Sequence, residues 1–459
     1  MVFLIGAIVG LVVPVAAEVP AVRQITHDLK NHSLDNNDNF SPDDRFLVYD
    51  TRENEGAIQN SISIEKVEIA TGKIDMIYRA PDAVKDRGPG VGAVSFHPVE
   101  DRVIFIHGPF TSTGLVYDQA CRFGAMVPAS GKVAMQPADA RDVTSPFTPG
   151  ALRGGTHRHE FSGNGEWIGF TYNDAIMKAR GVDLRTIGVT RLGTPVTPDA
   201  ATDSAPGNHD GAGFSVLVVH VVPEPQPGSD EISRAAEDSW VGAQGYVKPD
   251  GSRQHARAFI GDTRDAQGRL LREVYLVDIP SVLTQPGPLG PLAGTLDAFP
   301  APPAGAAQRR LTHTEHRPHP GCFGIVRADP QGRWIAFLAN DDAGARQIFL
   351  VSPLGGEMIQ FSSIPGGVRF APRWLPSGKA VVTVSEDHHL VAVCTVPGEH
   401  FGKSVSLYDG GEAAPYALVV SHDGKTIAFN RDIPQAGVAY RQIFVLPYEE
   451  GEYGIPIAD

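Results

Sequence analysis

The chain has 459 residues, of which 42% are hydrophobic, 8% aromatic and 20% charged. This composition is typical of a globular protein and excludes collagen-like and disordered chains. The formal net charge is −14 and no run of Lys or Arg occurs, so nucleic acid is not expected as a partner because its phosphates would be repelled. Gly and Pro together make up about a fifth of the residues, which favours many short strands and turns over long helices.

The N-terminal segment predicts export. An apolar run extends from Val2 to Val13, and small residues ending at Ala17 follow it. This pattern predicts a signal peptide over residues 1–17 and a periplasmic or secreted mature chain without a transmembrane span. No Lys or Arg precedes the apolar run, so a membrane anchor or a buried strand is the alternative.

A repeated strand-turn-strand pattern occupies most of the remaining chain. Each copy has an apolar strand, a turn rich in Ser, Pro, Asp and Gly, and a second strand with alternating polarity. Six copies begin at Asn39, Val94, His159, Arg327, Arg373 and Val420. Third and fourth strands follow, at a repeat of about 40–65 residues, which is typical of a β-propeller. We predict an all-β fold, a single propeller of four-stranded blades over residues 18–459, with seven blades and with six or eight as alternatives.

The repeat is obscured between residues 190 and 308. We place a seventh blade on residues 213–221, 256–261 and 273–279, interrupted by an insertion over residues 223–254. Within this insertion, a start at Ser229 or Asp230 and an end before Gly242 predict a short capped helix. The strand beginning at Val22 is expected to pair with the C-terminal strands, since a closed ring leaves no exposed edge. We expect a monomer.

Two histidines stand one residue apart at His157 and His159. With a strand period of two, both side chains point the same way and can share one metal ion. In a propeller, residues that precede the repeated turns converge from distant blades. The residues expected at the same mouth are Asn36, Asn37, Asn39, His97, His209, His316, His319 and Arg373. A purely structural role for the two histidines is the alternative.

A second possible metal site lies in the segment from His313 to Cys322. His313, His316, His319 and Cys322 follow one another at intervals of three residues, and imidazole and thiolate groups are good zinc ligands. Pro318 and Pro320 prevent a helix that would stack them, so an exposed loop with a buried Cys322 is the alternative.

The repeats resemble those of TolB-like propellers. Longer segments, namely 25–52, 146–174 and 228–234, resemble the YidR-like bacterial propellers, a family without an assigned activity. A shorter segment around His157 and His159 is similar to the metal-ligand region of the oligogalacturonate lyases, seven-bladed propellers that hold a divalent metal.

The lyase resemblance implies β-elimination on a uronate-containing oligosaccharide, in which a metal ion and a base act together. It implies that His157 and His159 bind a divalent metal, Mn or Zn. His209 would be a third ligand or the catalytic base, and Arg153 would hold the substrate carboxylate, with Tyr172 as a further catalytic candidate. The alternative is a non-catalytic propeller that binds an envelope protein or a glycan.

Overall fold

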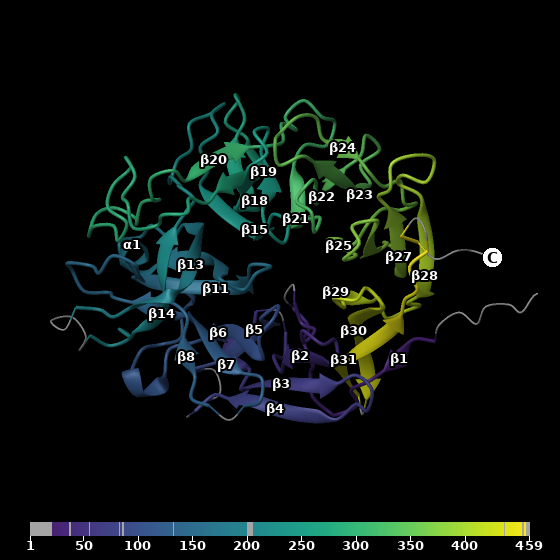
Figure 1. The fold of residues 1–459 in the computed structure, drawn as a ribbon, viewed down its shortest axis with the longest axis horizontal. Coiled ribbons are helices and arrows are strands. Elements are labelled where there is room, and N and C mark those ends of the chain that lie inside the picture. The colour runs from purple at the N-terminus through teal and green to yellow at the C-terminus, as the bar shows by residue number, and fades with distance from the viewer. Residues whose placement is uncertain are drawn as a thin grey trace, which may run out of the picture.

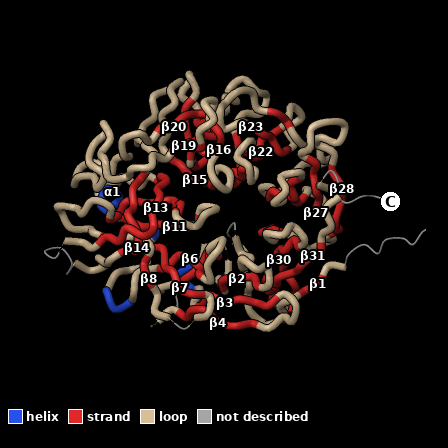
Figure 2. Tube along the Cα trace, in the orientation of Figure 1, coloured by secondary structure: helices blue, strands red, loops and turns tan. Residues whose placement is uncertain are grey.

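The computed structural model describes residues 21–35, 38–54, 56–81, 83–84, 87–131, 133–199, 205–435, 437–451 and 454–455. Residues 1–17, where a signal peptide is predicted, and Asn36 and Asn37 lie outside these ranges. The chain forms seven antiparallel sheets that follow one another around a ring, as expected for a seven-bladed propeller (Figure 1). In blades 1 to 6 the strand that comes first in the chain lies nearest the centre, and in blade 7 β29 does so while β1 lies at the outer edge (Figure 1). Loops cover both ends of the ring (Figure 2).

The strands divide among the blades in chain order. Blade 1 contains β2 (Phe46–Asp50), β3 (Ser63–Glu68) and β4 (Ile74–Arg79); blade 2 contains β5 (Val91–Phe96), β6 (Arg102–His107), β7 (Phe123–Pro128) and β8 (Gln136–Pro137). Blade 3 contains β11 (Gly154–Phe161), β12 (Trp167–Asp174), β13 (Arg185–Val196) and β14 (Gly211–Leu217); blade 4 contains β15 (Arg234–Trp240), β18 (Ala256–Arg264), β19 (Leu270–Asp278) and β20 (Ala307–Arg310). Blade 5 contains β21 (Cys322–Ala328), β22 (Ile335–Asn340), β23 (Arg346–Val351) and β24 (Ile359–Gln360). Blade 6 contains β25 (Arg373–Trp374), β26 (Ala380–Val384), β27 (His389–Cys394) and β28 (Ser404–Asp409); blade 7 contains β29 (Tyr416–Val420), β30 (Thr426–Gln435), β31 (Val438–Pro447) and β1 (Arg23–Gln24).

Smaller elements complete the chain. Two short pairs, β9 (Ala140–Arg141) with β10 (Ala151–Leu152) and β16 (Tyr246–Val247) with β17 (Arg253–Gln254), lie outside the blades, and three 3-10 turns span Ile58–Asn60, Thr111–Thr113 and Gln119–Cys121. Blade 1 has three regular strands, and the preceding segment bridges them through Ser33 to Asp50 and Phe40 to Leu47.

The ring is closed by strands from both ends of the described chain. β1 pairs antiparallel with β31, so that Arg23 lies opposite Val445, and Figure 1 shows the two side by side. The amide of Ile25 donates a hydrogen bond of 2.9 Å to the carbonyl of Ile443, and the Ile25 side chain is buried between blades 7 and 1. The predicted pairing of the N-terminal strand with the C-terminal strands is therefore confirmed.

The repeated turns lie where the sequence pattern predicts them. Four of them contain a glycine with positive φ, Gly165, Gly332, Gly378 and Gly424, and in blade 1 Asp44 has the same conformation. In the blade 3 turn, Ser162 donates to Asn164 and accepts a hydrogen bond from the amide of Trp167, which pins the tight connection. Local side-chain chemistry of this kind specifies each hairpin without help from the rest of the fold.

The helix predicted within residues 229–242 is wrong, because residues 234–240 form β15, the innermost strand of blade 4. Ala235 and Ala236 are almost fully buried there, and interblade packing overrides the local helix propensity of this segment. β14, which we assigned to this blade, is the outermost strand of blade 3. The α-helix that the described residues do contain is α1 (Ala175–Ala179), whose first turn is capped by Asp174 accepting from the amide of Met177.

Candidate functional site in the centre of the ring

A β-bulge interrupts the innermost strand of five blades. The residue at which each bulge begins has positive φ: Ala93 (53°), Arg158 (50°), Glu237 (59°), Gly324 (72°) and Ala417 (51°). A left-handed conformation costs a residue other than glycine about 1–2 kcal/mol, and bulges re-aim the side chains beside them. The bulge in β11 also breaks the strand period of two on which the common orientation of His157 and His159 was predicted.

Three arginines from distant blades meet at the axis of the ring. Arg158 belongs to blade 3, Arg327 to blade 5 and Arg373 to blade 6, and we call them the axial arginines. Electrostatic interactions connect Arg327 with both others and Arg373 with Arg158. Blades 3 and 6 are not neighbours in the ring, so these side chains can approach one another only at its centre (Figure 1).

The guanidinium of Arg327 is buried without a full set of hydrogen bonds. Arg327 is 6% exposed, and its Nη1 donates a hydrogen bond of 3.2 Å to the carbonyl of Val326. Nε and Nη2 have no hydrogen-bond partner among the described residues. Burial, followed by repulsion from Arg373, holds the pKa of Arg327 well below its usual value. Arg158 and Arg373 are only half-buried, so solvent reaches the cluster.

The carboxylates near the axis are already engaged with two other arginines. Arg257 binds Glu160 at 2.7 Å and also binds Asp238, while Arg52 binds Asp35 at 2.7 Å and Asp50 at 2.9 Å.

Arg158 and Arg327 have no ion pair within the described ranges, whereas Arg373 donates a hydrogen bond of 2.7 Å to the backbone carbonyl of Leu418. The charge of Arg158 and Arg327 is therefore not balanced by an ion pair among these residues. One anionic group from a ligand would balance this charge and satisfy the open donors of Arg327.

His157 and His159 are buried and neutral. Burial lowers the pKa of His159 to about 3, and it holds the pKa of His157 well below the usual value, in both cases with a further contribution from Arg122. Nε2 of His157 lies 3.2 Å from Oδ1 of Asn173, whereas Nε2 of His159 lies 2.8 Å from the hydroxyl of Thr156. The two imidazoles therefore contact different neighbours.

His209 lies in another environment, between blades 2 and 3. Its ring centroid is 4.8 Å from that of Phe123, and its backbone pairs with Arg141. Burial lowers its pKa to about 3. Among the described residues, no three or more His, Cys, Asp and Glu side chains are grouped so as to hold a metal ion. The metal site predicted from His157, His159 and His209 is thus not formed, and these residues do not fit a Mn or Zn ion.

Arg153 and Tyr172 belong to a buried network that holds blade 3 together. Nε of Arg153 binds Asp174 at 2.9 Å, and the hydroxyl of Tyr172 donates to the same carboxylate at 3.0 Å. Arg153 also donates to the carbonyls of Thr295 and Ala298 in the segment beside blade 4. These contacts connect blade 3 with the segment beside blade 4, and the catalytic roles of Arg153 and Tyr172 stay predictions.

The second predicted metal set is also separated. His313, His316 and His319 are exposed, whereas Cys322 is fully buried. Burial, reinforced by the carboxylate of Glu273, raises the pKa of the Cys322 thiol well above its usual value. A protonated buried thiol is not available to a metal held by exposed histidines, so these four residues do not form the predicted zinc site.

The axial arginines were only partly found from sequence. Arg373 was expected at the channel mouth, and Arg327 begins a repeat copy, but neither was singled out as part of a charged cluster. Arg158 stands between the two histidines, and the sequence pattern predicted no role for it. The available signal was positional, because all three arginines precede a repeated turn by five to seven residues.

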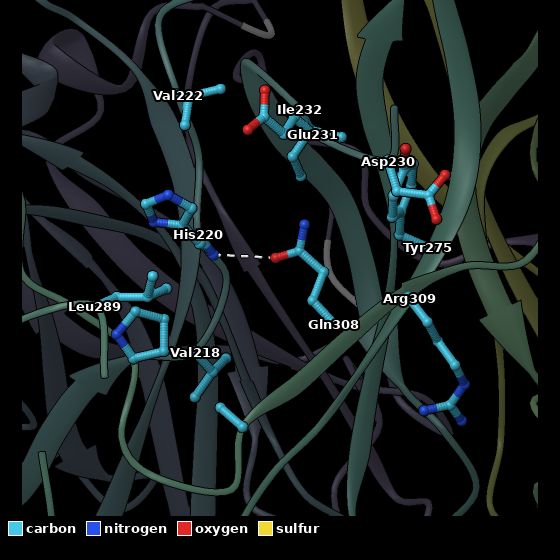
Figure 3. A pocket seen from close by; sticks show the side chains of 12 residues that line it. Val218, His220, Val222, Asp230, Glu231, Ile232, Tyr275, Leu289, Gln308 and Arg309 are labelled. Carbon is cyan, nitrogen blue, oxygen red and sulfur yellow. Dashed lines mark hydrogen bonds between the residues drawn. The ribbon is translucent and has the colours of Figure 1, made fainter. Parts of the chain in front are cut away.

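A surface pocket of about 390 Å³ lies away from this centre, beside the outer strands of blade 4 (Figure 3). Val218, Ile232 and Leu289 form apolar parts of its wall, and Asp230 and Arg309 lie at its charged edge. Across the pocket, the backbone amide of His220 donates a hydrogen bond of 3.0 Å to the side-chain carbonyl of Gln308, so part of the polar lining of the pocket is already paired. Its mixed lining favours no single ligand chemistry.

Comparison with known proteins identifies relatives along the whole chain. Residues 90–204 match the family model described as "Protein of unknown function (DUF3748)". Over 425 residues the chain is 39% identical to "Uncharacterized protein YidR" of Escherichia coli (strain K12), which covers 91% of this chain and 96% of that protein.

Solved structures with the same fold are much more distant in sequence. An oligogalacturonate lyase in complex with manganese and an oligogalacturonate lyase from Vibrio parahaemolyticus each align with a TM-score of 0.53 and 11% identity. Both alignments cover 95% of this chain, with 95% of the first and 96% of the second. TolB from Acinetobacter baumannii aligns with a TM-score of 0.35 and 11% identity, covering 91% of this chain and 84% of TolB. Within the described ranges, no helix has the length and apolar character needed to cross a membrane.

Proposed function

The chain belongs to the YidR family, and from this premise we propose that it is an exported propeller that binds a uronate-containing oligosaccharide at the centre of its ring. The observation that carries this proposal is the buried guanidinium of Arg327, whose Nε and Nη2 have no hydrogen-bond partner among the described residues and which lies beside Arg158 and Arg373. Guanidinium groups recognise carboxylates through paired hydrogen bonds, and the two open nitrogens of Arg327 supply such donors. The proposal of export is supported by the apolar N-terminal run that ends before Pro14.

An acidic sugar is the first ligand to test because solved structures with this fold include oligogalacturonate lyases. A uronate offers one carboxylate for the axial arginines and hydroxyl groups for the neighbouring carboxylates Glu160 and Asp238. These acids are held in place by Arg257, and their oxygens are hydrogen-bond acceptors. Each charged group near the axis thereby has a role in orienting the ligand.

The geometry of the site favours binding of the oligosaccharide without its cleavage. β-Elimination requires a base that reaches the proton next to the uronate carboxylate. His157 and His159 are buried and already engaged with neighbouring side chains, so they are not placed to serve as that base. Accumulation of an unsaturated product would show that another side chain acts as the base and would replace the binding function with a lyase function.

Isothermal titration calorimetry of the purified protein with trigalacturonate tests the proposal, with maltotriose as the neutral control. We expect trigalacturonate alone to bind, and we expect Arg327→Gln to weaken it about 10-fold or more, while the exposed Arg180→Gln leaves it unchanged. Absence of trigalacturonate binding at millimolar concentration would overturn the proposal. Elemental analysis belongs in the same experiment, because a stoichiometric metal lost in His157→Ala would restore the metal-dependent alternative.

A further inference from the structure

A second group of arginines lies at one end of the ring and is separate from the axial arginines. We propose that Arg122, Arg185 and Arg234, here called the mouth arginines, form a second anion-binding subsite, so that the ligand is an oligomer with at least two acidic groups. This inference rests on the proposed function, since it extends the same binding site towards solvent.

The topology places the mouth arginines on one face of the ring. In every blade the first and third strands begin at the same face, because neighbouring strands are antiparallel. Arg234 begins β15, a first strand, and Arg185 begins β13, a third strand. Arg122 immediately precedes β7, which is also a third strand. Blades 2, 3 and 4 are neighbours, so the three side chains lie around one sector of the mouth.

Arg185 and Arg122 are held by neutral groups rather than by carboxylates. Arg185 donates from Nε to Oδ1 of Asn173 at 3.0 Å and from Nη2 to Oε1 of Gln119 at 2.8 Å. Arg122 donates from Nε to the hydroxyl of Tyr117 at 2.7 Å. Such contacts fix the orientation of the guanidinium groups and leave their charge available to a ligand.

The nearby carboxylates are shared with other cations. Asp262 lies 3.9 Å from Arg234 but 3.6 Å from Arg272. Asp118 and Asp183 both pair with Lys178, at 2.7 and 3.5 Å. Burial, followed by repulsion from Arg234 and Arg122, lowers the pKa of Arg185 to about 10, which is consistent with incomplete compensation of the positive charge.

A buried histidine beside the mouth arginines has an open hydrogen-bonding position. His157 is 2% exposed, and its Nε2 shares Asn173 with Arg185. Its Nδ1 has no hydrogen-bond partner in the part of the chain that the structure describes. Electrostatic interactions connect this imidazole with Arg122 and Arg185. A buried polar atom without a partner is uncommon and marks a place where the protein alone does not complete the network.

The depth of the two arginine groups determines the size of the ligand. Arg158 and Glu237 begin equivalent bulges in blades 3 and 4, and Arg234 precedes Glu237 by three residues of strand. Three residues of strand span about 10 Å, whereas a hydrogen bond spans about 3 Å. The backbone positions of the two groups therefore differ in depth. A ligand with two acidic groups would place one group at the axis and the other at the mouth.

Calorimetry with galacturonate, which has one carboxylate, and with trigalacturonate tests the second subsite. We expect trigalacturonate to bind the unmodified protein about 10-fold or more tightly than galacturonate. The double variant Arg185→Gln/Arg234→Gln should lose this gain and keep its affinity for galacturonate. Arg327→Gln should weaken both ligands, and Arg180→Gln, on the same face but paired with Asp297, should change neither.

The outcomes separate the two proposals. If trigalacturonate binds no more tightly than galacturonate, or if the double variant binds it as the unmodified protein does, the second subsite is refuted while the axial site stands. If neither ligand binds, the proposed function itself fails. Melting temperatures of all variants, together with the single variant Arg234→Gln, identify a loss of binding that results only from misfolding.

Discussion

Replacing Arg327 with methionine should stabilise the ligand-free protein. Methionine fills a similar volume without charge, and it removes a guanidinium whose Nε and Nη2 have no partner. Each buried unsatisfied donor costs about 1–3 kcal/mol, and the lost bond to Val326 offsets about 1 kcal/mol of that. Repulsion from Arg158 and Arg373 is removed as well. We therefore expect the free energy of unfolding to rise by about 1–3 kcal/mol.

The corresponding change in melting temperature is small but measurable. With an unfolding entropy of about 2.1 cal/mol/K per residue, 459 residues give roughly 1 kcal/mol/K, so the melting temperature should rise by roughly 1–3 °C. Differential scanning calorimetry without ligand measures this change. The same variant should lose the increase in melting temperature that trigalacturonate gives the unmodified protein.

Arg257→Met is the matched control, because Arg257 is also a buried arginine near the axis. Its removal leaves Glu160 and Asp238 buried without their cation, so we expect a loss of about 3–5 kcal/mol. The two substitutions thus have opposite expected signs. A melting temperature that falls in Arg327→Met would refute the argument, since it would show that the axial arginines are already fully compensated within the protein.

Three further predictions concern the blades and their closure. Hydrogen bonds that the His422 imidazole donates to Asp38, at 3.0 Å, and to Asp44, at 2.9 Å, raise the pKa of His422 to about 9. Because the pKa of His422 is raised in the folded state, its stabilisation of the fold is complete below the unfolded pKa of about 6.5 and is lost as the pH rises to about 9. Urea midpoints measured at pH about 6 and about 10 should therefore differ less in His422→Gln than in the unmodified protein. Arg153→Ala should lower the free energy of unfolding by about 3–5 kcal/mol because it leaves Asp174 buried without its cation, and a urea midpoint equal to that of the unmodified protein would contradict the structural role. Ile25→Ala should cost about 2–5 kcal/mol by loosening the contact of β1 with blade 1, whereas Val438→Ala, at an exposed position of β31, should cost far less in the same assay.

The channel and the mouth show why the candidate site was harder to predict than the fold. The histidine pair was interpreted with an unbroken strand period, but the bulge that begins at Arg158 breaks this period between the two residues. A bulge depends on the pairing of β11 with β12, which on either side of it joins His157 with Thr171 and Glu160 with Gly169, and this pairing is not visible in the short segment. The helix predicted before Gly242 failed for a similar reason, because its alanines are buried between blades.

The sequence by itself determined the propeller of repeated blades and favoured seven of them, because its information is local and repeated. Each hairpin is specified by a turn such as Ser162–Gly165, and the alternating strands that follow define which face is buried. The tertiary structure alone decided which charged residues meet. Arg158 and Arg373 are separated by more than 200 residues, and only closure of the ring through β1 and β31 brings them to one axis, where burial strengthens the interaction between their charges.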